Sequence, residues 1–242
     1  SHGYSQNVIG GVTTVTSTWN MESPVFDPYG TLLSSTIRSF SGKGHAAVTD
    51  IKTMTSLEAD YSELTGESVT YNEFTAYGMQ KKGETFGKSF GEGKVIVGES
   101  YTDNHYNAYG IVDGQVSHGY SQNVIGGVTT VTSTWNMESP VFDPYGTLLS
   151  STIRSFSGKG HAAVTDIKTM TSLEADYSEL TGESVTYNEF TAYGMQKKGE
   201  TFGKSFGEGK VIVGESYTDN HYNAYGIVDG QVSHGYSQNV IG

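Results

Sequence analysis

Residues 12–21 read VTTVTSTWNM, and larger apolar side chains alternate in them with threonine and asparagine. Alternation of this kind is typical of a β-strand, because successive side chains of a strand point to opposite faces. We expect Val15 and Trp19 on the core face, and Thr16 and Thr18 on the solvent face. The stretch predicts an all-β protein.

Turn signals follow this strand at short intervals. Residues 27–30 (DPYG) match a type I turn, with Asp first, Pro second and Gly fourth. Glycine turns at residues 41–44 and 91–93 each precede a short apolar run, and the first of them predicts a returning strand over residues 45–55. The pattern indicates antiparallel β-sandwich or barrel modules of about seven or eight strands.

One segment fits two structures. Leu57, Tyr61 and Leu64 lie on one helical stripe, but Leu57, Ala59 and Tyr61 also alternate with acidic residues as in a strand. The sequence therefore leaves open one short helix near residues 56–65.

The whole chain is a tandem repeat. Residues 1–116 recur without change as residues 117–232, and residues 233–242 begin a third copy. A period of 116 residues is longer than that of solenoid repeats and has the size of a domain. Repetition of whole domains supplies length and multiple attachment points. We expect the chain to be a segment of a longer array.

The dipeptide Asp113-Gly114, repeated as Asp229-Gly230, indicates where one module closes. Asp-Gly is a strong signal for a two-residue hairpin, because a type I′ turn requires positive φ at both positions. The hairpin would join the strands on either side, and it would cross the boundary between copies.

That hairpin shifts the expected modules relative to the copies. We expect β modules at residues 11–126 and 127–242, joined at the Gly-Gly pairs, and residues 1–10 as a strand of an upstream module. The strand shared between modules or chains would carry these residues in its three copies: Tyr4, Val8, Ile9, Tyr120, Val124, Ile125, Tyr236, Val240 and Ile241.

Tyrosine is abundant, with 17 in the chain, and Tyr101, Tyr106 and Tyr109 crowd one short stretch. A flat aromatic ring offers contact area at little entropic cost, so these three residues are the expected binding aromatics, with surface glycans as the ligand. On the neighbouring strand, Ser117 and Gly119 leave one face nearly flat.

Charge and composition exclude several classes of protein. With 26 acidic and 14 basic residues the net charge is −12, which argues against nucleic acid and against anionic membranes. No apolar run approaches the roughly 18 residues of a membrane span, so membrane insertion is not expected. The chain has no cysteine, which excludes disulfides and thiolate metal sites.

Catalytic and metal-binding patterns are also lacking. The sequence has no His-Glu-x-x-His and no phosphate loop, so we expect no enzyme and no cofactor. Glu58, Asp60 and Glu63 fit a solvated face. His105 and His118 would lie roughly 13 Å apart in the predicted hairpin, too far to share a zinc ion. Calcium at a module junction is left open.

Two functions remain. The first is a structural tandem-repeat protein of the cell surface or extracellular space that forms or extends a filament, stalk or adhesin fibre, with itself as head-to-tail partner. The alternative is a multivalent, lectin-like repeat array.

Overall fold

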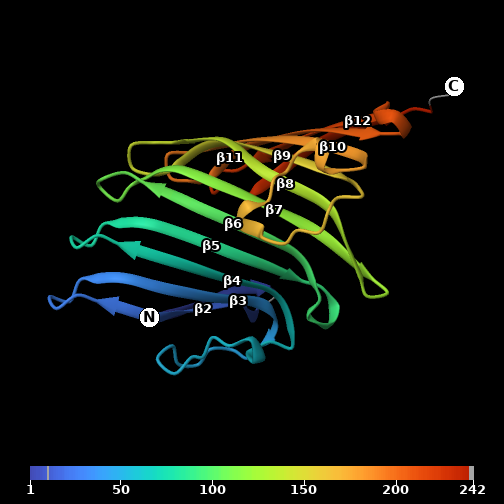
Figure 1. The fold of residues 1–242 in the computed structure, drawn as a ribbon. Helices are drawn as coiled ribbons and strands as arrows, with labels where there is room; N and C mark the ends of the chain where they lie inside the picture. The colour runs from blue at the N-terminus through green and yellow to red at the C-terminus, as the bar shows by residue number, and fades with distance from the viewer. Residues whose placement is uncertain (10, 240–242) are drawn as a thin grey trace. The chain divides into compact units, whose positions relative to one another are not determined.

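The computed structural model describes residues 1–9 and 11–239. The chain forms two compact units, Ser1–Gly110 and Ile111–Gly242. Within each unit, consecutive strands pair antiparallel into one open layer (Figure 1). The all-β prediction is confirmed. Sandwich or barrel modules are not found: no second sheet covers the layer of either unit in the described residues, and neither layer closes on itself.

The described residues of the first unit form six strands and two single-turn 3-10 helices. Its strands are β1 (His2–Ile9), β2 (Val12–Phe26), β3 (Leu32–His45), β4 (Glu63–Phe74), β5 (Gln80–Phe90) and β6 (Ile96–Tyr106), and its helices are η1 (Glu58–Asp60) and η2 (Glu92–Lys94).

In the second unit, residues up to 239 are described, and they form seven strands and three 3-10 helices. Its strands are β7 (Val112–Ile125), β8 (Val128–Phe142), β9 (Leu148–Lys159), β10 (Glu179–Phe190), β11 (Gln196–Phe206), β12 (Ile212–Tyr222) and β13 (Val228–Ser237), and its helices are η3 (Ile167–Thr169), η4 (Glu174–Asp176) and η5 (Glu208–Lys210).

In the segment that fitted either a helix or a strand, residues 58–60 form the 3-10 turn η1, and β4 begins at Glu63. The Asp60 carboxylate accepts hydrogen bonds from the Leu57 amide (2.8 Å) and the Thr55 hydroxyl (3.0 Å), which fixes this turn. The predicted returning strand over residues 45–55 is wrong, because β3 continues through the expected glycine turn to His45 and a loop follows it.

A turn that ends in Tyr-Gly connects the two strands of each long hairpin. At the predicted DPYG turn, the Gly30 amide bonds to Asp27 O (3.1 Å), Gly30 has φ +86°, and the Asp27 carboxylate accepts from the amides of Tyr29 and Thr31. This prediction is confirmed. The same geometry recurs in the TAYG and NAYG segments, at Gly78 and Gly110, so it is general to both copies.

The Asp-Gly hairpin prediction is wrong. Asp113 and Gly114 lie inside β7, and Asp229 and Gly230 lie inside β13. The chain has already reversed before it reaches them.

A competing turn explains this. The Asn223 carboxamide oxygen accepts from the amides of Tyr225 (2.9 Å) and Ile227 (3.1 Å), and Gly226 supplies the positive φ of +73°. Side-chain capping and a left-handed glycine together stabilise the turn at the NAYG segment, which ends three residues before Asp229.

The Gly126-Gly127 pair, expected to be a junction between modules, is itself a tight turn. Its φ values are +59° and +80°, and it joins β7 to β8 with Ile125 opposite Val128. Both strands belong to the second unit. The limits of the folding modules, residues 11–126 and 127–242, stay a prediction.

A β-bulge in β2 reverses the expected faces. The register slips between Val15 and Ser17, so Thr16 is the extra residue and Val15 shares a face with Thr18. Val15 is 1 % exposed and Thr18 is 0 % exposed, whereas Trp19 turns to the other face. The expectation that Thr18 faces solvent is therefore wrong.

A small core lies where the loop after β3 folds against the sheet. Phe40, Tyr61 and Leu64 are buried together, with Phe90 packed against them. The Tyr61 hydroxyl donates to Phe40 O (3.0 Å) and bonds with the Thr18 hydroxyl (2.9 Å). The second unit repeats this core with Phe156, Tyr177, Leu180 and Phe206.

Candidate functional site

The two faces of each sheet carry different chemistry. We call the face that holds Val185, Phe202 and Tyr217 the aromatic face, since these residues are in register on β10, β11 and β12. We call the opposite face, which holds Thr186 and Thr201, the hydroxyl face.

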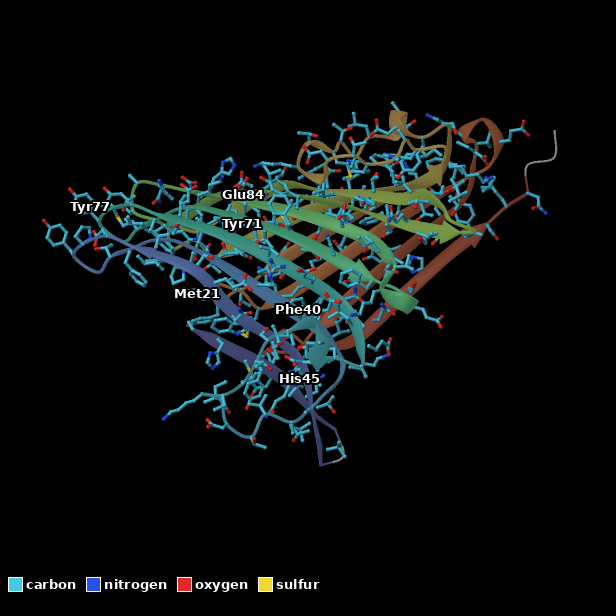
Figure 2. The ribbon with its side chains drawn as sticks, turned by 60° about the horizontal axis from the view of Figure 1, so that its bottom comes forward. Met21, Phe40, His45, Tyr71, Tyr77 and Glu84 are labelled. Atoms are coloured by element: carbon cyan, nitrogen blue, oxygen red, sulfur yellow. The ribbon has the colours of Figure 1, made fainter. Side chains whose placement is uncertain are left out.

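A ladder of rings crosses the aromatic face of the second unit. Centroid distances are 6.0 Å from Tyr187 to Phe202, 5.0 Å from Phe202 to Tyr217 and 5.2 Å from Tyr217 to His234. Tilted or edge-on rings at these spacings are attractive. The first unit repeats the first two contacts with Tyr71, Phe86 and Tyr101; Figure 2 labels Tyr71.

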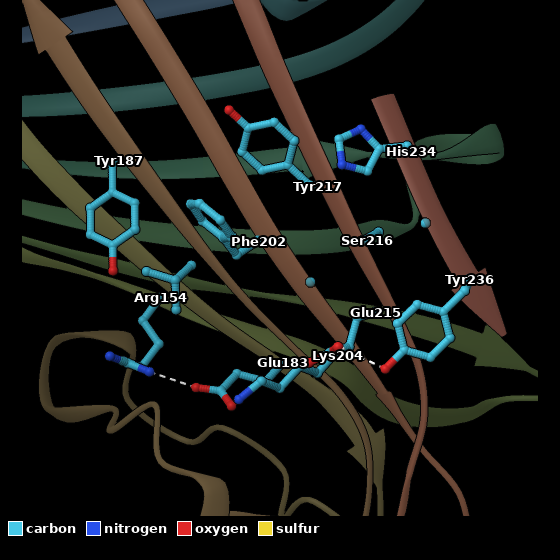
Figure 3. Close-up of a pocket in the computed structure, with 13 residues that line it drawn as sticks. Arg154, Glu183, Tyr187, Phe202, Lys204, Glu215, Ser216, Tyr217, His234 and Tyr236 are labelled. Atoms are coloured by element: carbon cyan, nitrogen blue, oxygen red, sulfur yellow. Dashed lines mark hydrogen bonds and ion pairs between the residues drawn. The ribbon is translucent and has the colours of Figure 1, made fainter. Parts of the chain in front are cut away.

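The ladder borders a hollow of about 550 Å³ on β9 to β13 (Figure 3). Its polar side holds Arg154, Glu183, Lys204 and Glu215. Arg154 bonds to Glu183, and the Tyr236 hydroxyl donates to a Glu215 oxygen at 2.7 Å.

Carboxylates fix the tyrosine hydroxyls of this face. The Tyr217 hydroxyl donates to Glu200 (2.9 Å), and this bond is the main reason why the pKa of Tyr217 is raised. The bond to Glu215 likewise raises the pKa of Tyr236. The pKa of the Glu200 carboxylate is lowered, mainly by its hydrogen bond with the Lys198 side chain. These phenols therefore stay protonated and hold one orientation.

From Thr186 to Ser216 the hydroxyl face of β10 to β12 carries small side chains, and the ring of Tyr222 lies over Gly199 at the end of β12. The hydroxyls of Thr186 and Thr201 bond to each other at 2.9 Å, and Gly203 leaves room for the Ser216 hydroxyl, which would lie 2.5 Å from an added Cβ. On β7, Ser117 and Gly119 alternate with His118 and Tyr120, which agrees with the flat face expected there.

The expected binding aromatics do not form one site. Tyr101 is 3 % exposed, packs on Phe86 and donates its hydroxyl to Glu84 (2.8 Å). Tyr106 lies five residues further along β6 and therefore on the opposite face. Tyr109 is 79 % exposed at a turn, so the three rings are not gathered.

Of the six most exposed tyrosines, sequence reasoning named only Tyr109 as a binding residue. The Tyr-Gly turns place six tyrosines at hairpin ends, and Figure 2 labels one of them, Tyr77. Their exposed fractions are 94 % (Tyr29), 87 % (Tyr77), 79 % (Tyr109), 86 % (Tyr145), 87 % (Tyr193) and 80 % (Tyr225). The repeated Tyr-Gly dipeptide was the available signal.

The predicted assembly strand appears in three forms. Tyr120, Val124 and Ile125 lie on β7, which pairs with β8. Tyr236 lies on β13, which pairs with β12, whereas Val240 and Ile241 lie outside the described residues.

The remaining copy of the assembly strand, at the N-terminal end of the chain, corrects an expectation. Tyr4, Val8 and Ile9 lie on β1, which pairs with β2 over its whole length. The expectation that this strand has no partner within the chain is therefore wrong.

The backbone N–H and C=O groups that point outward from β13 correspond to those that bond to the neighbouring strand in β1. The Gln238 amide donates to Val213 O (2.8 Å), and because bonded pairs alternate along antiparallel strands, Tyr236 bonds toward β12 while Gly235 and Ser237 point outward. In β1 the Met21 amide donates to Ser1 O (2.7 Å). By the same alternation Gly3 and Ser5, the counterparts of Gly235 and Ser237, bond to β2.

The acidic cluster has separate structural partners. Glu58 pairs with Lys94, Glu63 pairs with Lys43 at 3.0 Å, and Asp60 caps η1. Within residues 1–9 and 11–239, no group of three or more His, Asp or Glu residues is placed to hold a metal ion.

In the part of the chain that the structure describes, no helix is long and apolar enough to cross a bilayer. Comparison with known protein families, curated proteins and solved structures finds no match for this chain.

Proposed function

We propose that this is a structural tandem-repeat protein that forms or extends an extracellular filament, stalk or adhesin fibre, in which copies of the repeat share a strand. The proposal assigns the protein no catalytic role. Its location outside the cell rests on the tandem repeat and the acidic composition alone.

The backbone complementarity of β1 and β13 carries the proposal. β1 and β13 are sequence copies of different parts of β7, and β1 pairs with β2 in the register in which β7 pairs with β8. β13 shows the same sequence paired with the strand before it. A strand of this sequence is thus built to bond on both edges.

Strand sharing follows from this. In β13 the outward groups of Gly235 and Ser237 lack the partners that Gly3 and Ser5 have in Trp19 and Ser17. If the β13 strand of one chain takes the place of β1 on β2 of another, those groups are satisfied and two sheets become one. Exposed strand edges are known templates for such addition.

A proline at the outward edge tests the proposal. Ser237→Pro removes one outward N–H without removing a bond to β12, and Ser237→Thr retains it as the matched control. We expect the wild-type chain and Ser237→Thr to form fibres or oligomers in sedimentation and electron microscopy as concentration rises, and Ser237→Pro to stay at the mass of one chain. A wild-type chain that never assembles, or a proline variant that assembles equally, contradicts the proposal.

A further inference from the structure

The hollow on the aromatic face of the second unit offers ring surface to a ligand. Tyr187 and Phe202 are each 47 % exposed, although each packs against a neighbouring ring. Half-exposed ring faces of this kind suit the C–H side of a sugar ring, which is flat and apolar. Strand sharing, as proposed above, does not use these rings.

The charges around the hollow are balanced. Arg154 and Lys204 lie beside Glu183 and Glu215 on its polar side (Figure 3). An anion would meet two carboxylates and a cation would meet two basic groups, so neither is favoured. Lys204 has no ion-pair partner in the described part of the chain, which leaves its ammonium group to donate to a ligand hydroxyl.

The size of the hollow is that of a binding site. Its volume of about 550 Å³ lies within the usual range for ligand pockets, ~300–1,000 Å³. The ladder from Tyr187 to His234 crosses four strands, or about 14 Å at the usual strand spacing, which is longer than one sugar ring.

We propose that this hollow binds a neutral oligosaccharide, with Tyr187 and Phe202 stacked on sugar rings, and Lys204 and Glu215 bonded to hydroxyl groups. Balanced charge selects a neutral chain, and the row of rings selects an extended one. The second unit would then present a glycan site on a structural sheet.

Calorimetric titration of the dilute full chain tests this site. The probes are cellotetraose, maltotetraose and chitotetraose as neutral oligosaccharides, and a heparin tetrasaccharide as the anionic comparison. We expect at least one neutral probe to bind and the heparin probe not to bind. Phe202→Leu, which keeps apolar bulk but removes the ring, should weaken binding at least tenfold.

The repeat supplies a matched control. Phe86→Leu is the same change in the same sequence context of the first unit, and it should alter affinity less than twofold. The proposal is overturned if no neutral probe binds, if only heparin binds, if Phe202→Leu binds like the wild type, or if both variants lose affinity equally. The oligomeric state plays no part in this readout, so its failure is distinguishable from failure of strand sharing.

Discussion

The two faces of the same strands differ in what they bury. The aromatic face holds the small cores, around Phe40 in the first unit and Phe156 in the second, and the ladder of rings. On β10 to β12 the hydroxyl face holds threonine, serine and glycine, with Thr186 and Thr201 bonded side chain to side chain. On β10 to β12 the ladder of rings thus lies on one face, and the threonine, serine and glycine residues lie on the other.

The largest expected effect contrasts neighbouring residues on the two faces. Phe156→Ala removes a buried ring from the core of the second unit and should cost about 3–5 kcal/mol of unfolding free energy. Ser155→Ala, one residue away on the hydroxyl face, should change it by less than about 0.5 kcal/mol. Urea unfolding measures both. Similar costs would show that both faces bury core.

A buried hydroxyl gives the next contrast. Thr134 is 0 % exposed and bonds to the hydroxyls of Ser172 and Tyr177, each at 3.0 Å. Thr134→Val leaves these groups underbonded and should cost about 1–3 kcal/mol. Thr186→Val on the hydroxyl face is the control, and its half-exposed site should cost clearly less in the same urea experiment. Equal losses would contradict the contrast.

Alkaline pH gives the smallest effect. Burial raises the pKa of Tyr177 above its ordinary value of 10.0, so the folded state holds the phenol proton more tightly than the unfolded state. The stability from this group is fully present below pH 10 and is lost as pH rises toward the folded pKa. We expect the urea midpoint to fall above pH 10, and to fall less steeply in Tyr177→Phe. Parallel curves would exclude a contribution from Tyr177.

The all-β class and the DPYG turn could be predicted, because alternation and turn chemistry are local. The faces of β2 could not be predicted, because the bulge at Thr16 shifts the alternation of side chains by one residue. No residue type at that position signals a bulge. The hairpin failed for another reason. Asp229-Gly230 and the NAYG segment are both good turn sequences separated by only two residues, and the side-chain cap of Asn223 favours the earlier one.

The candidate surfaces were predicted unevenly. The assembly strand could be proposed from the repeat alone, but its pairing on opposite edges in β1 and β13 required the registers. The ladder was missed because Tyr187 and Phe202 meet only through strand pairing. Tyr101, Tyr106 and Tyr109 are close in sequence, but alternation along β6 and the turn after it separate them.

Amide hydrogen exchange along β13 tests strand sharing most directly, with single chains compared with concentrated, assembled material. The amides of His234 and Tyr236 bond to β12 and should be protected in both states. Those of Gly235 and Ser237 point outward, so we predict that they exchange fast in the single chain and become protected on assembly. Exchange of Gly235 and Ser237 at the same fast rate in assembled material would contradict the shared strand.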